Sequence, residues 1–147
     1  MNIREIAVSE LEKLLSLYEY LPPSDEPRPE RAVIEAGWRD MKKNPLLRCF
    51  GGFIGETLIS SCMLTIIPNL TRGCRPYGVI ENVVTHGDFR RKGHGRSLLH
   101  HVLAYAWSRN CYKVMLMTGR KDEGINRFYE AAGFDRHAKQ AFLARPT

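Results

Sequence analysis

The chain has 147 residues, of which 44% are hydrophobic and 26% are charged, and its formal net charge is +6. These values are typical of one soluble globular domain spanning residues 1–147, with enough apolar side chains for a core. The positive net charge favours an anionic partner. The candidates are a nucleic acid, a membrane face and a phosphorylated small molecule, and the charge alone does not distinguish them.

Three absences narrow the classes further. None of the four cysteines lies in a CxxC pair, so we expect no metal site. The start, MNIREIAVSE, lacks the apolar core of a signal peptide. No apolar run is long enough to span a bilayer. We therefore expect a cytoplasmic protein with reduced thiols and no membrane partner.

The first 45 residues predict one strand and two helices. Residues 2–7 are typical of a strand, and apolar residues recur at helical spacing from Leu11 to Tyr18. Ser9 and Glu12 have the spacing of a capping box for that helix. Four prolines in residues 21–29 predict a stiff loop. A second helix should begin near Pro29 or Glu30 and end at Asn44–Pro45.

The middle of the chain predicts three strands. Residues 46–67 indicate two strands joined by a turn near Gly55 and Glu56, followed by a loop over residues 68–76. Residues 77–85 (YGVIENVVT) carry apolar side chains on both faces, which favours a strand inside the sheet.

The remaining residues predict a crossover unit. An apolar stripe from Leu98 to Ala106 indicates a helix, and residues 112–118 indicate a strand parallel to 77–85. A short helix over Ile125–Ala132 would end at Gly133, and a last strand is expected at residues 140–144. The fold class is α/β (α+β), with a mixed, mostly antiparallel sheet, one central parallel βαβ pair and flanking helices.

The stretch FRRKGHGRSLL, residues 89–99, stands between that strand and the long helix. The first N–H groups of a helix lack partners within the helix, and the helix dipole makes this end positive, so a phosphate can bind there. Gly93 and Gly95 remove side chains that would obstruct it. The P-loop pattern GxxxxGK[ST] is absent from the sequence. The dinucleotide-binding pattern GxGxxG is absent as well, because position 98 holds Leu98 where that pattern needs a glycine.

Residues 90–95, RRKGHG, match the Q/R-x-x-G-x-G/A signature of the GNAT superfamily of N-acetyltransferases. Residues 125–134, INRFYEAAGF, resemble a later segment of the same fold, and the order of elements resembles it throughout. Residues 79–89 look much like the equivalent segment of glucosamine-6-phosphate N-acetyltransferases. The regions that usually select the acceptor do not identify glucosamine 6-phosphate as the substrate of this chain.

The resemblance implies transfer of an acetyl group from the co-substrate acetyl-CoA to an amine. It implies that the turn binds the pyrophosphate of CoA and that the preceding strand pairs with the pantetheine arm. It also implies that this strand and the strand at residues 112–118 separate to make room for that arm. Asn126 corresponds to a position that contacts CoA, although its amide would equally serve as a local cap. The implied cofactor-binding residues are Val83, Val84, Thr85, Arg90, Arg91, Lys92, Gly93, His94, Gly95, Arg96, Ser97, Asn126 and Tyr129.

Two residues are candidates for catalysis. Glu81 interrupts an apolar strand, where a carboxylate is costly unless it is paired or used. We expect it to be buried and to act as the base, directly or through water, since burial raises the pKa of a carboxyl group. Tyr129 matches the tyrosine that lies near the CoA sulfur in many family members and is the candidate acid. The alternatives are a structural carboxylate and a core aromatic side chain.

The leading hypothesis is an acetyl-CoA-dependent N-acetyltransferase acting on a primary amine, with a small-molecule acceptor favoured over a protein. Tyr18 and Trp38 either line the acceptor pocket or serve packing. A basic nucleic-acid-binding module is the alternative from another class, but no nucleic-acid-binding motif is present. A CoA-binding sensor without catalysis is the third hypothesis. The family resemblance also allows a homodimer.

Overall fold

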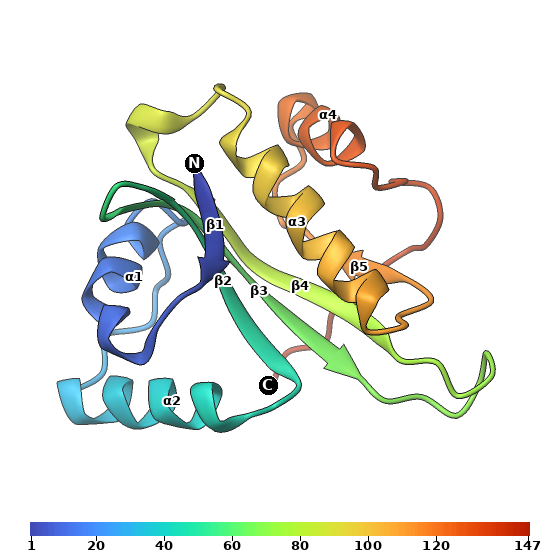
Figure 1. Cartoon of the computed structure of the whole chain (residues 1–147), viewed down its shortest axis with the longest axis horizontal. Helices are drawn as coiled ribbons and strands as arrows, with labels where there is room; N and C mark the ends of the chain where they lie inside the picture. Colours follow the sequence, from blue (N-terminus) through green and yellow to red (C-terminus); the bar gives the residue numbers. More distant parts are fainter.

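The computed structural model describes residues 1–147 as one five-stranded sheet between two layers of helices (Figure 1). The strands are β1 (Asn2–Glu5), β2 (Leu47–Ile54), β3 (Thr57–Ile67), β4 (Tyr77–Thr85) and β5 (Val114–Leu116). The helices are α1 (Leu11–Tyr18), α2 (Arg31–Lys43), α3 (His94–Ser108) and α4 (Glu123–Ala131), with the 3-10 helices η1 (Val8–Glu10) and η2 (Gly87–Phe89). None of these helices combines the length and the apolarity needed to cross a membrane.

The sheet has the order β1-β2-β3-β4-β5, and only β4 and β5 are parallel. The predicted antiparallel meander followed by a βαβ unit is therefore confirmed, with α3 as the crossover. The β2–β3 turn is at the predicted place, where Gly55 has a φ of 57°. α4 ends as predicted too, because Gly133 has a φ of 99° and the Phe134 N–H bonds the Tyr129 carbonyl oxygen at 3.1 Å.

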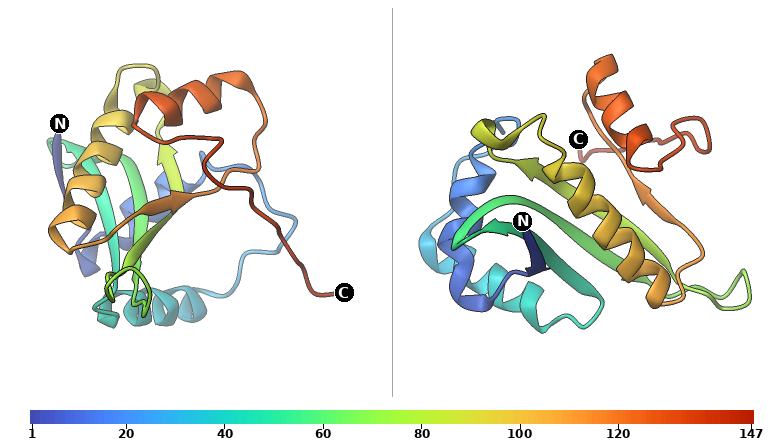
Figure 2. Two further views of the ribbon diagram at one scale, coloured as in Figure 1. Left: turned by 90° about the vertical axis from the view of Figure 1, so that its right-hand side faces the viewer. Right: turned by 45° about the horizontal axis from the view of Figure 1, so that its top comes forward.

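The expected strand at residues 140–144 does not form. This segment is an extended tail that runs away from the body (Figure 2), and Phe142 is 87% exposed. Phe142 and Leu143 are adjacent, so pairing with β5 would turn them to opposite faces of the sheet. As a result the parallel pair lies at the edge of the sheet, with β5 as its last strand, and not in the centre.

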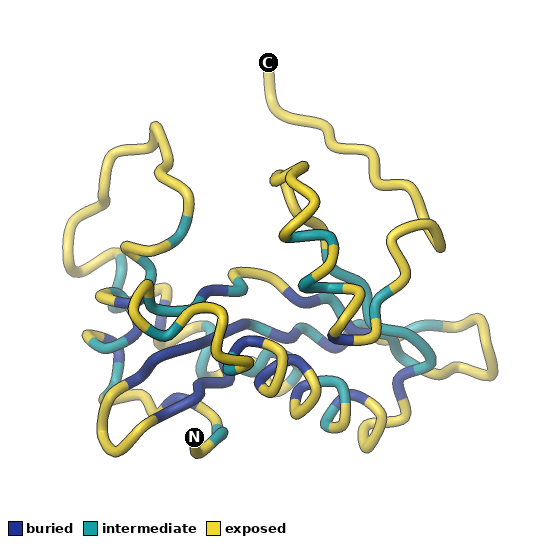
Figure 3. The backbone as a smooth tube through the Cα atoms, turned by 90° about the horizontal axis from the view of Figure 1, so that it is seen from above, coloured by how far each residue is buried: buried dark blue, intermediate teal, exposed yellow.

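The core has two parts, one on each face of the sheet. Between the sheet and α3 lie Phe50, Leu64, Ile80, Leu98 and Leu99, among others. Between the sheet and the α1–α2 layer lie residues that include Ile6, Leu14, Leu17, Trp38 and Phe53. Figure 3 shows this distribution, with buried residues along the strands and on the inner side of α3. The sheet is thus covered on both faces, as the apolar pattern of 77–85 predicts.

The start of α1 differs from the expected capping box. The helical segment begins earlier, in η1, and the Glu10 carboxylate accepts the Ala7 N–H at 2.9 Å. Ser9 caps nothing, and Glu12 instead forms an ion pair with Arg31 at the start of α2. The helix was predicted correctly but its first residue was not, because the carboxylate that bonds the free N–H comes two residues earlier in the sequence.

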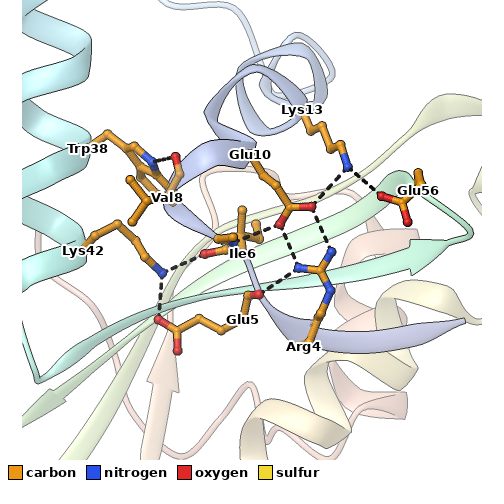
Figure 4. A network of polar contacts seen from close by, with 10 residues as sticks. Arg4, Glu5, Ile6, Val8, Glu10, Lys13, Trp38, Lys42 and Glu56 are labelled. Carbon is orange, nitrogen blue, oxygen red and sulfur yellow. Dashed lines mark hydrogen bonds and ion pairs between the residues drawn. The ribbon is translucent and has the colours of Figure 1, made fainter.

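Glu10 is the centre of a polar network that joins β1, α1 and the β2–β3 turn (Figure 4). Its carboxylate accepts two N–H groups of Arg4 at 2.8 and 2.9 Å and the Lys13 ammonium at 3.1 Å. Lys13 also reaches Glu56 at 3.5 Å. Glu10 is only 11% exposed, and the hydrogen bonds from Arg4 hold the pKa of its carboxyl group far below the ordinary value. Fixed, paired charges of this kind stabilise the fold.

We expect Glu10→Gln to lower the free energy of unfolding by about 1–3 kcal/mol at pH 7, because it removes the charge from several hydrogen bonds in a poorly exposed site. The control is Glu56→Gln, whose side chain is 94% exposed and should cost no more than about 0.5 kcal/mol. Because the folded pKa is lowered, the contribution of Glu10 is complete above the unfolded pKa of about 4.3 and declines below it. Denaturant titrations at pH 7 and pH 3 should therefore show the difference between wild type and Glu10→Gln shrinking at acid pH. Equal losses in the two variants would contradict this role.

Candidate active site

The site is built where β4 and β5 separate. The two strands pair at three positions only, from Gly78 opposite Val114 to Ile80 opposite Leu116. Beyond Ile80, residues 81–85 of β4 have no strand partner on the β5 side. The splay that the family resemblance implies is therefore present. It leaves backbone N–H and C=O groups available to an extended ligand, in the way that a sheet edge accepts a peptide.

A β-bulge accompanies this separation. The register between β3 and β4 shifts between Ser61 and Met63, and Asn82 adopts a left-handed φ of 53°. Asparagine tolerates this conformation better than most residues. Both Glu81 and Asn82 are exposed. The expectation that Glu81 is buried is thus wrong, because the bulge turns this part of β4 outward, so burial cannot be what makes it a base.

The turn before α3 presents a helix N-terminus without a cap. Gly93, at the N-cap position, has a φ of 82° and provides no side-chain bond, and the first turn holds no acidic residue. The first N–H bonded within the helix is that of Ser97, to the Gly93 carbonyl oxygen at 3.0 Å. Three N–H groups, those of residues 94–96, are therefore free to bind an anion. The exposed cations Arg91 and Arg96 flank them.

The two glycines of the turn have different roles. Gly93 is needed for its left-handed backbone conformation, which side chains disfavour. Space is not the reason, since a Cβ there would meet no other atom. At Gly95 a Cβ would lie 3.0 Å from the Phe128 ring and 3.2 Å from Thr85 Oγ1. Gly95 therefore serves the close packing of α3 against α4 and β4. The idea that both glycines clear the way for a phosphate is wrong for this one.

α4 contributes Tyr129 and Asn126. Tyr129 is half-buried against Phe128 and Phe134, with ring centroids 4.9 and 6.2 Å away. Burial chiefly raises the pKa of its hydroxyl. The Asn126 side chain contacts Glu123, whose pKa falls to about 2, mainly through the hydrogen bond from Arg136.

The segment between β4 and the turn is held by contacts that the sequence did not reveal. Ser60 Oγ donates to the Val84 carbonyl oxygen and lies next to Thr85 Oγ1, both at 3.1 Å. Arg90 donates to the Thr85 carbonyl oxygen, and Tyr20 bonds His86 at 2.9 Å. The partners lie 5 to 66 residues apart, and no spacing rule links such pairs, so only the fold identifies them.

The remaining predicted residues lie on several elements of the fold. Val83 packs on the α3 side of β4, Val84 is buried on the α1 side, and His94 is half-buried beside Phe89. Lys92 donates to the Asp88 carbonyl oxygen at 2.9 Å. Trp38 is 4% exposed and donates to the Val8 carbonyl oxygen, so it serves packing. Tyr18 is half-buried; burial raises the pKa of its hydroxyl, and a bond to the Asn82 side chain opposes this.

Comparison with known proteins identifies the family. Residues 9–134 match the Acetyltransferase (GNAT) family. The chain belongs to the GNAT family. It is 33% identical to a glucosamine 6-phosphate N-acetyltransferase of Trypanosoma brucei brucei over 95% of this chain and 94% of that protein. The family resemblance predicted from residues 90–95 and 125–134 is confirmed, and the chain is an acyltransferase enzyme of the N-acetyltransferase type.

Solved structures agree with this assignment. A protein of Agrobacterium tumefaciens str. C58, assigned as an acetyltransferase, superposes with a TM-score of 0.91 at 38% identity, covering 99% of this chain and 100% of that chain. An acetyltransferase of Trypanosoma brucei has a TM-score of 0.78 at 31% identity, covering 98% and 99%. The whole chain therefore has the GNAT fold.

Proposed function

We propose that this enzyme transfers an acetyl group from acetyl-CoA to the primary amine of an anionic small molecule. The observation that carries the proposal is the uncapped N-terminus of α3, which stands beside the unpaired stretch of β4. An anionic group and an extended arm in one ligand fit those two features together. Acetyl-CoA has both, in its pyrophosphate and its pantetheine.

The residues present fit this co-substrate. The N–H groups of His94, Gly95 and Arg96 would hold the pyrophosphate, and Arg91 and Arg96 would add positive charge. The free edge of β4 at Val83, Val84 and Thr85 would pair with the pantetheine arm. Ser97, in the first turn of α3, would stand next to the phosphates, and Asn126 on α4 would contact the co-substrate.

When bound, acetyl-CoA supplies the acetyl group as a thioester. The chain's own residues then move two protons. The acceptor reacts as the neutral amine, since an ammonium group has no lone pair, and Glu81 takes the one proton that its nitrogen must lose, directly or through water, as the C–N bond forms. Tyr129 gives its proton to the sulfur as the C–S bond breaks, which leaves a neutral thiol. A backbone N–H near Val83 or Val84 donates to the carbonyl oxygen as it becomes negative.

The exposure of Glu81 changes how it would work. A carboxylate in water is a weak base toward an ammonium group, so its role depends on being placed beside the amine when acceptor and co-substrate exclude water from the cleft. The raised pKa of Tyr129 keeps its hydroxyl protonated at neutral pH, as an acid requires. The two groups stand on different elements, Glu81 on β4 and Tyr129 on α4.

The acceptor is the least constrained part of the proposal. The relative at 33% identity over nearly the full chain is named for glucosamine 6-phosphate, an amino sugar with a phosphate. The net charge of +6 suits an anionic acceptor. Glucosamine 6-phosphate is therefore the first amine to test, with unphosphorylated glucosamine beside it.

We expect calorimetric titration with acetyl-CoA to show saturable binding that Arg96→Glu weakens by roughly 10-fold or more, a change of about 1.4 kcal/mol. Glutamate in the first turn favours the helix dipole, so this variant should keep or slightly raise the unfolding temperature. The control is Arg39→Glu, an exposed reversal on α2. Absence of wild-type binding at millimolar acetyl-CoA would refute the proposed function.

For catalysis, we expect Tyr129→Phe and Glu81→Gln each to lower kcat by about 100-fold or more while the acetyl-CoA Kd stays within about twofold. The matched controls are Tyr105→Phe, whose ring packs on Phe50 at 5.2 Å, and Glu56→Gln. Because burial raises the Tyr129 pKa, its loss of a proton should not limit the rate at neutral or mildly alkaline pH. Stopped-flow detection of the released thiol measures each rate, and a wild-type kcat in either variant would remove that residue from the chemistry.

We also propose that the enzyme is a homodimer in which the tail of each copy covers the free edge of β5 in the other. That edge borders a groove of about 750 Å³ whose lining includes Trp107 and Met115, and also Phe142 of the chain's own tail and Tyr129 of the proposed site. The tail carries Phe142 and Leu143, which are 87% and 75% exposed. An unpaired strand edge and an exposed apolar segment are each unfavourable in water, and exchange between two copies satisfies both.

If so, light scattering should give twice the chain mass for the wild type, and Phe142→Asp should shift the protein toward the monomer by about 10-fold or more in dissociation constant. Leu70→Asp is the control, because Leu70 is 90% exposed in the loop between β3 and β4, at a distance from the tail in sequence. A monomeric wild type at micromolar concentration would exclude this arrangement.

A further inference from the structure

The end of α1 is fastened to the segment that leads from β4 into the turn. The Tyr20 ring packs at a tilt of 44° against the His86 ring with centroids 4.4 Å apart, and its hydroxyl lies 2.9 Å from His86 Nε2. His86 Nδ1 accepts the Asp88 N–H at 3.2 Å, so the proton of the neutral ring is on Nε2 and is donated to Tyr20. Gly87 closes the contact, since a Cβ there would be 3.1 Å from the Tyr20 ring.

Arg90 completes this contact from the other side. Its Nε donates to the Thr85 carbonyl oxygen at 3.0 Å and its Nη2 donates to the Tyr20 carbonyl oxygen at 3.2 Å. Its guanidinium carbon lies 5.9 Å from the centre of the Tyr20 ring. We call Tyr20, His86 and Arg90 the Tyr20 clasp. One cation thus joins two backbone segments that are far apart in the sequence.

Arg90 is the first residue of the family signature, and the sequence predicts it to bind the co-substrate. The geometry indicates otherwise. Arg91 has a left-handed φ of 59°, so the chain reverses direction immediately after Arg90. Arg90 points to backbone carbonyl oxygens and Arg91 is exposed without a hydrogen bond inside the chain. Donors already directed at two carbonyl oxygens are poorly placed to bind a pyrophosphate as well.

Tyr20 immediately precedes the loop over residues 21–30. The other end of this loop is held where Arg31 pairs with Glu12 and Glu35. Four of its residues are prolines, which fix their φ angles and stiffen it. A stiff loop with both ends anchored takes its position from the anchors. The Tyr20 clasp anchors this loop at the end of β4, the strand that carries the proposed base Glu81, and the Tyr18 hydroxyl bonds the side chain of Asn82 beside that base.

We propose that Arg90 is a positioning residue for the acceptor, which acts by holding the 21–30 loop against the end of β4, and that it is not a phosphate ligand. This inference rests on the proposed function. It assigns opposite effects to neighbouring arginines: Arg90 governs the acceptor KM, and Arg91 governs acetyl-CoA binding.

The test compares Arg90→Met with Arg91→Met in two measurements. With glucosamine 6-phosphate as acceptor, Arg90→Met should raise the acceptor KM about 10-fold while leaving the acetyl-CoA Kd within about twofold. Arg91→Met should do the reverse. Hydrogen exchange of the free enzyme needs no acceptor, and amides of residues 19–30 should exchange faster in Arg90→Met than in Arg91→Met.

The outcomes distinguish a failure of the proposed function from a failure of the inference about Arg90. If the wild type binds no acetyl-CoA, the proposed function fails, whereas the exchange result still decides whether Arg90 anchors the loop. If Arg90→Met weakens acetyl-CoA binding as much as Arg91→Met and leaves the loop amides unchanged, Arg90 is a phosphate ligand and the inference is wrong. Should Arg90→Met fail to fold, Tyr20→Ala removes the ring on His86 and must give the same KM and exchange changes. Arg90→Lys should rescue only in part, because lysine cannot reach both carbonyl oxygens in one plane.

Discussion

The early end of the pairing between β4 and β5 is the constraint on which the site depends. α3 follows β4 and α4 follows β5, so the separation of the two strands also sets the positions of the two helix starts. At that end Gly95 lets α3 come within van der Waals distance of Phe128 on α4, which closes the top of the opening. The bulge at Asn82 changes the course of β4 at the same level. Pairing continued to Thr85 would fill the space that an extended ligand requires.

The two helix starts at this end are chemically different, although both have a positive dipole end. In α4 the Asp122 carboxylate accepts the Ile125 N–H at 2.9 Å, and Glu123 follows in the first turn. The Asp122 carboxylate satisfies one of the free N–H groups, and both carboxylates oppose a second anion. In α3 the cap is a glycine and the first turn has no acid. Of these two helices, α3 alone therefore offers a site to a phosphate, and α4 is free to present Tyr129.

Sequence patterns recovered the parts of the structure that depend on local periodicity. The meander, the crossover through α3, both helices of the first layer and the end of α4 at Gly133 follow from apolar spacing and from glycine and proline positions. The features that failed depend on three-dimensional neighbours. The exposure of Glu81 depends on a bulge one residue further on, the packing of Gly95 depends on Phe128, and the tail at 140–144 has no partner strand within the chain.

The Tyr20 clasp bears on how a signature residue is interpreted, because Arg90 has partners inside the chain that the sequence does not reveal. Basic residues in a turn before a helix all favour anions at long range, so their number alone does not tell which of them meets a phosphate. Arg90 is engaged with two carbonyl oxygens and Lys92 with a third, at 2.9 Å. The cations that remain without a partner inside the chain are Arg91 and Arg96, one on each side of the free N–H groups of α3. Fewer hydrogen-bond donors are thus available to a ligand than the sequence suggests, while the positive charges of Arg90 and Lys92 remain and their donors join backbone segments beside β4.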